Sequence, residues 1–167
     1  MEVKAYRFED DGSIPNNPYF PVLLYKEAFA ETDAIQSTFE NNGWGNSWVN
    51  GVFDYHHYHS NTHEVLGVKS GRATVQLGGA TGDLVSLQAG DVLILPAGTG
   101  HRRLEASEDF AIVGAYPDGR DYDTLTGNPE ERPDNVNRIE TIAKPETDPV
   151  FGTAGPLHTE WNKEETT

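Results

Sequence analysis

The sequence predicts an all-β fold, and three observations predict it. The 167 residues include 17 glycines and 10 prolines, which points to many turns. Between residues 48 and 116, short apolar stretches alternate with Gly-rich breaks. Helical periodicity is convincing in one short segment. Several short strands with tight turns are typical of a β-sandwich or β-barrel.

Two strands are expected before the barrel. Residues 3–8 alternate between apolar and polar side chains and predict a short strand. Residues 20–25 form a second apolar segment. Because Pro21 cannot donate a ladder hydrogen bond, we expect this segment to be an edge strand or an extended arm.

One helix is expected, over residues 34–40. Ile35 and Phe39 stand four positions apart, which places them on one helical face. Thr32 or Asp33 could cap its start, and the sequence Asn-Asn-Gly at 41–43 would end it.

The barrel core is expected over about residues 48–116. Its strands are predicted near residues 48–58, 64–69, 72–77, 84–88, 91–95, 101–106 and 110–116. We interpret residues 1–167 as a single domain, with an N-terminal arm and helix over 1–47 and an irregular C-terminal tail over 117–167. The tail is rich in proline but keeps large apolar residues, so we expect it to pack along the barrel.

Composition excludes several classes of function. The chain has no cysteine, so disulfides and thiolate metal sites are excluded. The net charge of -15 disfavours binding to nucleic acid or to an anionic membrane. The sequence shows neither an apolar run of membrane-spanning length nor a signal peptide. A cytoplasmic protein is the expectation.

Five of the six histidines fall in two short stretches, and their spacing predicts a metal site. His57 and His59 point to the same side if their segment is a strand. A carboxylate a few residues later and His101 on a returning strand would complete a set of three histidines and one acid. Imidazole and carboxylate suit divalent Fe, Mn, Ni or Zn.

The two stretches resemble the paired motifs of the cupin superfamily. The first motif has glycine, five residues, His-x-His, three or four residues, glutamate, six residues and glycine, which matches Gly51, His57, His59, Glu64 and Gly71. The second motif matches Gly90, Pro96, Gly98 and His101, and its final Asn is replaced here by Glu105. Nine of ten fixed positions therefore agree, in order.

The resemblance implies a double-stranded β-helix, or jelly-roll barrel, that holds a divalent metal. Its ligands would be His57, His59, Glu64 and His101, with open positions left for substrate or water. One alternative stays open for the acidic ligand. His63 is adjacent to Glu64, and strand alternation allows only one of the two to face inward.

Three further residues are candidates for catalysis: Tyr55, Arg103 and Glu105. Tyr55 would share the inward face with Phe53 and His57 if the strand over 48–58 is unbroken. Arg103 and Glu105 would share a face with His101. Arg103 could bind an anionic substrate or form a salt bridge to Glu105. His56 is expected to point outward, and His158 to lie outside the site.

Two classes of function remain open on the sequence. The first is a metal-dependent enzyme for a small molecule, with dioxygenase or isomerase chemistry. The second is a non-catalytic cupin that binds a small ligand. A homodimer is expected in either case, because a jelly roll leaves edge strands that an arm such as residues 1–30 could cover in a partner.

Overall fold

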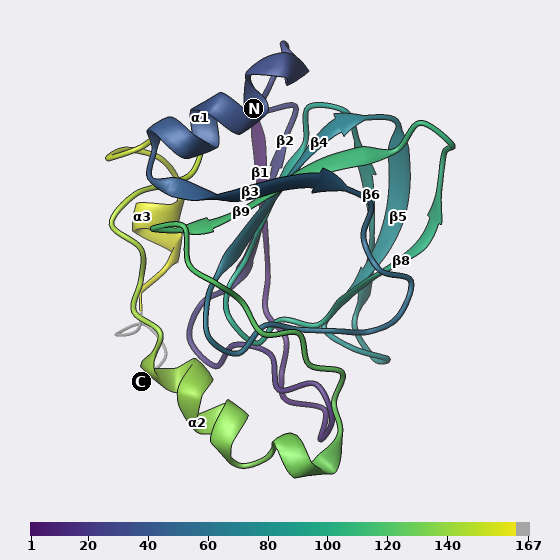
Figure 1. The fold of residues 1–167 in the computed structure, drawn as a ribbon, viewed down its shortest axis with the longest axis vertical. Coiled ribbons are helices and arrows are strands. Elements are labelled where there is room, and N and C mark those ends of the chain that lie inside the picture. The colour runs from purple at the N-terminus through teal and green to yellow at the C-terminus, as the bar shows by residue number, and fades with distance from the viewer. Residues whose placement is uncertain (163–167) are drawn as a thin grey trace.

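Two antiparallel sheets form a jelly-roll β-barrel, which confirms the predicted fold class (Figure 1). The computed structural model describes residues 1–162. The six-stranded sheet has the order β1 (Glu2–Tyr6), β2 (Val22–Lys26), β7 (Val92–Leu95), β4 (Glu64–Ser70), β9 (Ala111–Pro117) and β3 (Trp44–Asn50). The three-stranded sheet has the order β6 (Asp83–Gln88), β5 (Arg72–Leu77) and β8 (His101–Ala106).

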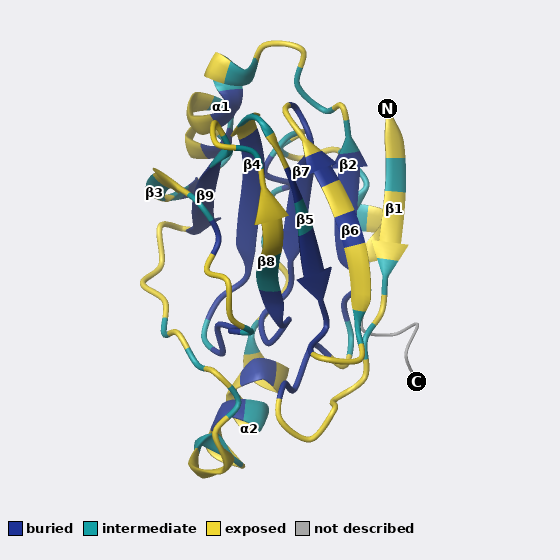
Figure 2. Cartoon of the chain, turned by 90° about the vertical axis from the view of Figure 1, so that its right-hand side faces the viewer, coloured by how far each residue is buried: buried dark blue, intermediate teal, exposed yellow. Residues whose placement is uncertain are grey.

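The three-stranded sheet has one buried face and one exposed face. Val75 and Leu77 of β5 and Val85 and Leu87 of β6 are buried between the sheets. In β6 the residues next to Val85 and Leu87 face solvent, so this strand alternates between exposed and buried positions (Figure 2). This period-two pattern is typical of an antiparallel sheet that covers a core on one side.

The central strands of the six-stranded sheet are buried on both faces. One face packs against the three-stranded sheet, and the other packs against helix α1 (Ile35–Asn41) and the C-terminal tail. Strand β7, with the sequence Val-Leu-Ile-Leu, is therefore buried at every position. A continuous apolar run, rather than alternation, is what such a strand requires.

Helix α1 confirms the helix expected near residues 34–40. A 3₁₀ turn, η1 (Thr32–Ala34), leads into it. Ile35 and Phe39 are fully buried, and they lie against β4 at Gly67. A Cβ atom at Gly67 would stand 2.6 Å from Ile35 Cγ2, so only glycine lets the helix approach this closely.

Strand β2 corrects the prediction of an edge strand. It lies between β1 and β7, and its register with β7 pairs Leu24 with Leu93. Pro21 precedes the strand and leaves every amide of β2 free to pair. The edge is β1, whose residues are mostly exposed (Figure 2).

The strand predicted over residues 48–58 is wrong in its second half. Strand β3 ends at Asn50, and residues 51–56 are irregular. The Asn50 side chain accepts a hydrogen bond from the Gly51 amide, a local bond that competes with sheet pairing. Pairing resumes as two isolated bridges, between His57 and His101 and between Tyr58 and Leu125.

The C-terminal tail packs along the barrel, as expected, but it also contains two helices that were not predicted. These are α2 (Asp134–Thr141), preceded by the 3₁₀ turn η2 (Pro129–Glu131), and α3 (Leu157–Glu160). Leu157 and Trp161 are fully buried, and the Trp161 ring stacks on Phe20 with 4.9 Å between centroids. Residues 163–167 of the predicted tail lie outside the described residues. Within residues 1–162, no helix is long and apolar enough to cross a membrane.

Candidate metal centre

Three histidines converge between the two sheets. His57 and His101 exchange two backbone hydrogen bonds, of 3.2 and 3.0 Å, which places their side chains next to each other. Their ring centroids are 4.0 Å apart, and the His59 ring lies 5.9 Å from His57 and 5.6 Å from His101. All three are buried, and one ring nitrogen of each lies within 4.8 Å of the others.

Hydrogen bonds to backbone carbonyls orient each of the three imidazoles. A carbonyl oxygen only accepts, so the bonded Nδ1 carries the proton and the lone pair of a neutral ring is on Nε2. The three pairs are His57 Nδ1 with Tyr55 O at 3.0 Å, His101 Nδ1 with Thr99 O at 3.0 Å, and His59 Nδ1 with Asp123 O. This arrangement is typical of imidazoles that bind a metal.

Glu64, the first residue of β4, points its carboxylate at the histidines. Its Oε1 lies 3.3 Å from Nε2 of His59 and 3.3 Å from Nε2 of His101. Its Oε2 accepts a 2.8 Å hydrogen bond from the Tyr116 hydroxyl, which in turn accepts one of 2.8 Å from Trp48 Nε1. Tyr116 and Trp48 therefore hold this carboxylate in place.

His63 faces the opposite side of β4 and does not join the cluster. Its Nε2 donates to Ala143 O at 2.9 Å, and its Nδ1 accepts the Ala97 amide at 2.9 Å. Its ring lies edge-on to Trp161, at 4.8 Å between centroids. Alternation along the strand has thus placed Glu64, rather than His63, beside His59 and His101.

Burial and the neighbouring side chains shift the pKa values of the cluster in different directions. Burial, reinforced by His101 nearby, lowers the pKa of His57 to about 3, so this imidazole is neutral. Burial also opposes a charge on His59, but the Glu64 carboxylate outweighs it and raises the pKa of His59. Burial likewise opposes a charge on Glu64, and the His59 and His101 imidazoles overcome it and lower the pKa of Glu64. A buried carboxylate of this kind needs a positive charge close to it.

These residues fit a divalent cation. Glu64 Oε1 is buried and has no hydrogen-bond partner of normal geometry among the described residues. It lies next to Nε2 of His59 and Nε2 of His101, whose Nδ1 atoms are the ones that bind the backbone carbonyls. A cation among them would use the carboxylate charge and three Nε2 lone pairs together.

A cavity of about 210 Å³ opens onto the cluster. Its lining includes the three histidines and Glu64, with aromatic and aliphatic side chains around them. Trp48, Val52 and Leu66 line it from the barrel side, and Phe53 and Tyr122 stand where it opens. The cluster is therefore accessible to a small molecule.

The C-terminal tail completes the site, which the sequence did not predict. Tyr122 stacks on Tyr116 at 4.4 Å between centroids and lies edge-on to His59 at 5.1 Å. The carbonyl of Asp123 orients His59, while the Asp123 carboxylate accepts hydrogen bonds from the amide and hydroxyl of Ser60. Neither residue belongs to a recognisable motif, and only the tertiary structure brings them to the histidines.

The three candidates for catalysis have different positions. Tyr55 is 44% exposed and stacks on Phe53 at 5.0 Å, beside the cavity rather than inside it. Arg103 donates its amide to Phe53 O, and its guanidinium lies next to Gly51, also outside the cavity lining.

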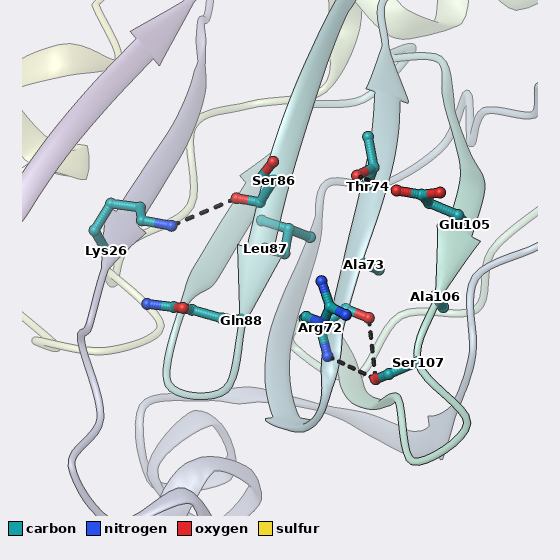
Figure 3. A pocket seen from close by; sticks show the side chains of 10 residues that line it. All are labelled: Lys26, Arg72, Ala73, Thr74, Ser86, Leu87, Gln88, Glu105, Ala106 and Ser107. Atoms are coloured by element: carbon teal, nitrogen blue, oxygen red, sulfur yellow. Dashed lines mark hydrogen bonds between the residues drawn. The ribbon is translucent and has the colours of Figure 1, made fainter.

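Glu105 faces away from the histidines, so the expected common face with His101 is wrong. A register shift between Thr74 and Val75, opposite β8, pairs Thr74 with Glu105 and turns Glu105 outward. Figure 3 shows Glu105 beside Thr74 in a separate polar pocket on the exposed face of the three-stranded sheet.

The two other histidines lie outside the cluster. His56 is partly exposed, and burial lowers its pKa. His158 donates its Nε2 to Gly152 O at 2.9 Å, within the tail.

Comparison with known proteins identifies the barrel. Residues 48–112 match the family described as Cupin domain. Over 162 residues, the chain is 45% identical to the uncharacterized protein YjlB of Bacillus subtilis (strain 168), which covers 97% of this chain and 98% of that protein.

Solved structures with a similar fold share less sequence. One is the WlaRB TDP-quinovose 3,4-ketoisomerase from Campylobacter jejuni, with 19% identity, a TM-score of 0.42, and coverage of 52% of this chain and 72% of that one. Another is a variant of oxalate decarboxylase from Bacillus subtilis, with 21% identity, a TM-score of 0.40, and coverage of 75% of this chain and 33% of that one.

Proposed function

The chain belongs to the cupin superfamily, and from this premise we propose that it is a metal-dependent enzyme acting on a small molecule. The proposed ligands are His57, His59, Glu64 and His101. The observation that carries the proposal is the convergence of three imidazoles beside a buried carboxylate. Two of their nitrogens, those of His59 and His101, lie 3.3 Å from a Glu64 oxygen that lacks a hydrogen-bond partner among the described residues.

The residues of the site have distinct roles in this proposal. The carbonyls of Tyr55, Thr99 and Asp123 fix the tautomer of each imidazole. Tyr116 holds the Glu64 carboxylate through its hydroxyl. The apolar walls exclude bulk water, which strengthens electrostatic interactions inside the cavity. A bound divalent ion would supply Lewis-acid or, if it is iron, oxygen-dependent redox chemistry.

Of the two chemistries, the cavity supports that of a dioxygenase better than that of an isomerase. An isomerase needs a general base that can reach the substrate. Apart from the four proposed ligands, the titratable side chains among the described residues lining the cavity are Tyr116 and Tyr122. Burial, together with the Glu64 carboxylate, raises the pKa of Tyr116 and keeps its hydroxyl protonated. Tyr116 is therefore a poor base.

The test is elemental analysis of the purified untagged protein beside the variants His57→Ala and His101→Ala. We expect close to one metal ion per parent chain and none in either variant, with circular dichroism unchanged. His56→Ala is the matched control, because this adjacent histidine lies outside the cluster, and it should retain the parent metal content. Normal metal content in both site variants would contradict the proposed ligands.

The alternative is a cupin that binds a small ligand without catalysis. A protein that is isolated without metal and also fails to bind added Fe, Mn, Ni or Zn would support this alternative. Bound iron together with substrate-dependent oxygen consumption would support the dioxygenase.

A further inference from the structure

The mouth of the cavity carries exposed aromatic and aliphatic side chains. Val49 is 47% exposed, Phe53 51%, Tyr55 44% and Tyr122 42%. Val49, Phe53 and Tyr122 line the cavity itself, and Tyr55 stacks on Phe53. Large apolar side chains grouped at a concave opening, rather than scattered over the surface, indicate a binding surface.

Two aromatic pairs adjoin the histidine cluster. Phe53 and Tyr55 are stacked at 5.0 Å, and Phe53 lies 5.1 Å from the His57 ring. Tyr116 and Tyr122 are stacked at 4.4 Å, and Tyr122 lies 5.1 Å from the His59 ring. Flat rings next to the proposed ligands favour a flat guest, because aromatic groups attract one another in stacked and edge-on arrangements.

The cavity offers no positive side chain to an anion. Among the described residues, those that line it include neither lysine nor arginine, and its one acidic residue is Glu64. The neighbouring cation is Arg103, whose Nη1 would lie 3.5 Å from a Cβ placed on Gly51. An anionic group that contacts these walls, rather than the proposed metal ion, would lose its hydration without a charged side chain to replace it.

The size of the cavity limits the guest. A cavity of about 210 Å³ is of a suitable size for a single ring with one or two small substituents.

We propose that the site takes a planar molecule of one aromatic or conjugated ring, whose ring is recognised by Phe53 and Tyr122 and is uncharged where it contacts these walls. This inference rests on the proposed function, because it names the class of substrate for the same site. Phe53 and Tyr122 would act by binding and would set specificity, while the four proposed ligands would hold the metal.

The experiment compares three probes of similar size by NMR and calorimetric titration: benzamide, benzoate and cyclohexanecarboxamide. Benzamide is planar and neutral, benzoate is planar and anionic, and cyclohexanecarboxamide is neutral but not planar. The charge comparison uses metal-free protein, because a carboxylate would bind a metal directly. The comparison of planarity is repeated on zinc-loaded protein.

We expect benzamide to bind at least about tenfold more tightly than either of the other probes, which corresponds to one good aromatic contact. Phe53→Ala and Tyr122→Ala should each weaken benzamide binding by about tenfold, and Tyr122→Phe should preserve it. Leu84→Ala is the control, because Leu84 is exposed on the other sheet and lies outside the cavity lining.

Benzoate binding as tight as that of benzamide would overturn the inference and would indicate that Arg103 reaches the guest. Absence of benzamide binding, or an equal loss in Leu84→Ala, would overturn it as well. Normal metal loading together with any of these results would leave the proposed metal site intact. Benzamide binding that depends on Phe53, in a protein that takes no metal, would contradict the metal site and support the cavity assignment.

Discussion

Tyr116 connects the proposed metal ligands to the barrel core. Its hydroxyl donates to Glu64 and accepts from Trp48, so a single oxygen fixes the position of a carboxylate that is fully buried. Removing that oxygen leaves two buried polar groups without their partner, at a cost of about 1–3 kcal/mol for each.

Tyr116→Phe should therefore reduce metal affinity by about 10–100-fold, the usual effect of losing a hydrogen bond to a metal ligand. The fold should persist, because the ring and its packing remain. Competition with a chelator would measure the affinity, and near-ultraviolet circular dichroism would check the fold. Tyr25→Phe is the matched control, because Tyr25 is also fully buried and hydrogen-bonded to a carboxylate, that of Asp148, away from the cluster. Equal affinities for Tyr116→Phe and the parent would show that Tyr116 does not position Glu64.

At the residue level, the sequence predicted side chains that follow a local spacing and missed those that depend on distant packing. His57 and His59 are two positions apart, and the choice of Glu64 over His63 followed from the family spacing. Tyr116 and Asp123 are 52 and 64 positions from the side chains that they contact, Glu64 and His59. No local period encodes such contacts, so they required the structure.

An ion pair joins the N-terminal arm to Arg132, which lies between η2 and α2. Arg132 donates two hydrogen bonds to the Asp10 carboxylate, of 2.8 and 2.7 Å. This arginine lowers the pKa of Asp10 below its usual value. The folded state therefore keeps Asp10 ionised at a lower pH than the unfolded chain does.

The contribution of this pair to stability is present above the ordinary aspartate pKa and is lost as the pH falls through the lowered value. At about pH 7, Asp10→Asn should lower the free energy of unfolding by less than about 1 kcal/mol, because the pair is partly exposed. The urea midpoint should fall accordingly. Its midpoint should converge with that of the parent in strong acid. Glu108→Gln, at an exposed acid between β8 and β9, is the control. A difference from the parent that persists unchanged in acid would contradict an ionic origin.

At the level of elements, a run of apolar residues predicted the position of a strand better than an isolated proline did. Pro21 suggested an edge strand, yet the four buried residues that follow it place β2 inside the sheet. Helix α2 had a signal of its own: Asn135 and Ile139 stand four positions apart and are both buried. Prolines close to this helix in the sequence concealed that spacing.

The quaternary arrangement that we propose for the whole molecule is a homodimer. The sequence suggested that the N-terminal arm covers an edge strand of a partner. In the structure, however, β2 of this arm pairs with β7 of the same chain. Strand β1 now forms one edge of the six-stranded sheet, and its outer hydrogen-bonding groups could pair with those of a second copy.

Sedimentation velocity should give a mass of about twice 18.4 kDa. The dimer should strengthen with added salt, because salt screens the repulsion between two chains that each carry a net charge of -15. A monomer at every concentration and ionic strength would contradict the proposal.

The position of Tyr122 and Asp123 after the last strand has a consequence for the order of events during protein synthesis. A nascent chain that has left the ribosome up to Pro117 already contains all the strands of the described structure, together with the full family motif. It still lacks the carbonyl that orients His59 and the ring that walls the cavity. The strands of the barrel are therefore complete before the site is finished, and capture of the proposed ion would be one of the last steps in the maturation of each new molecule.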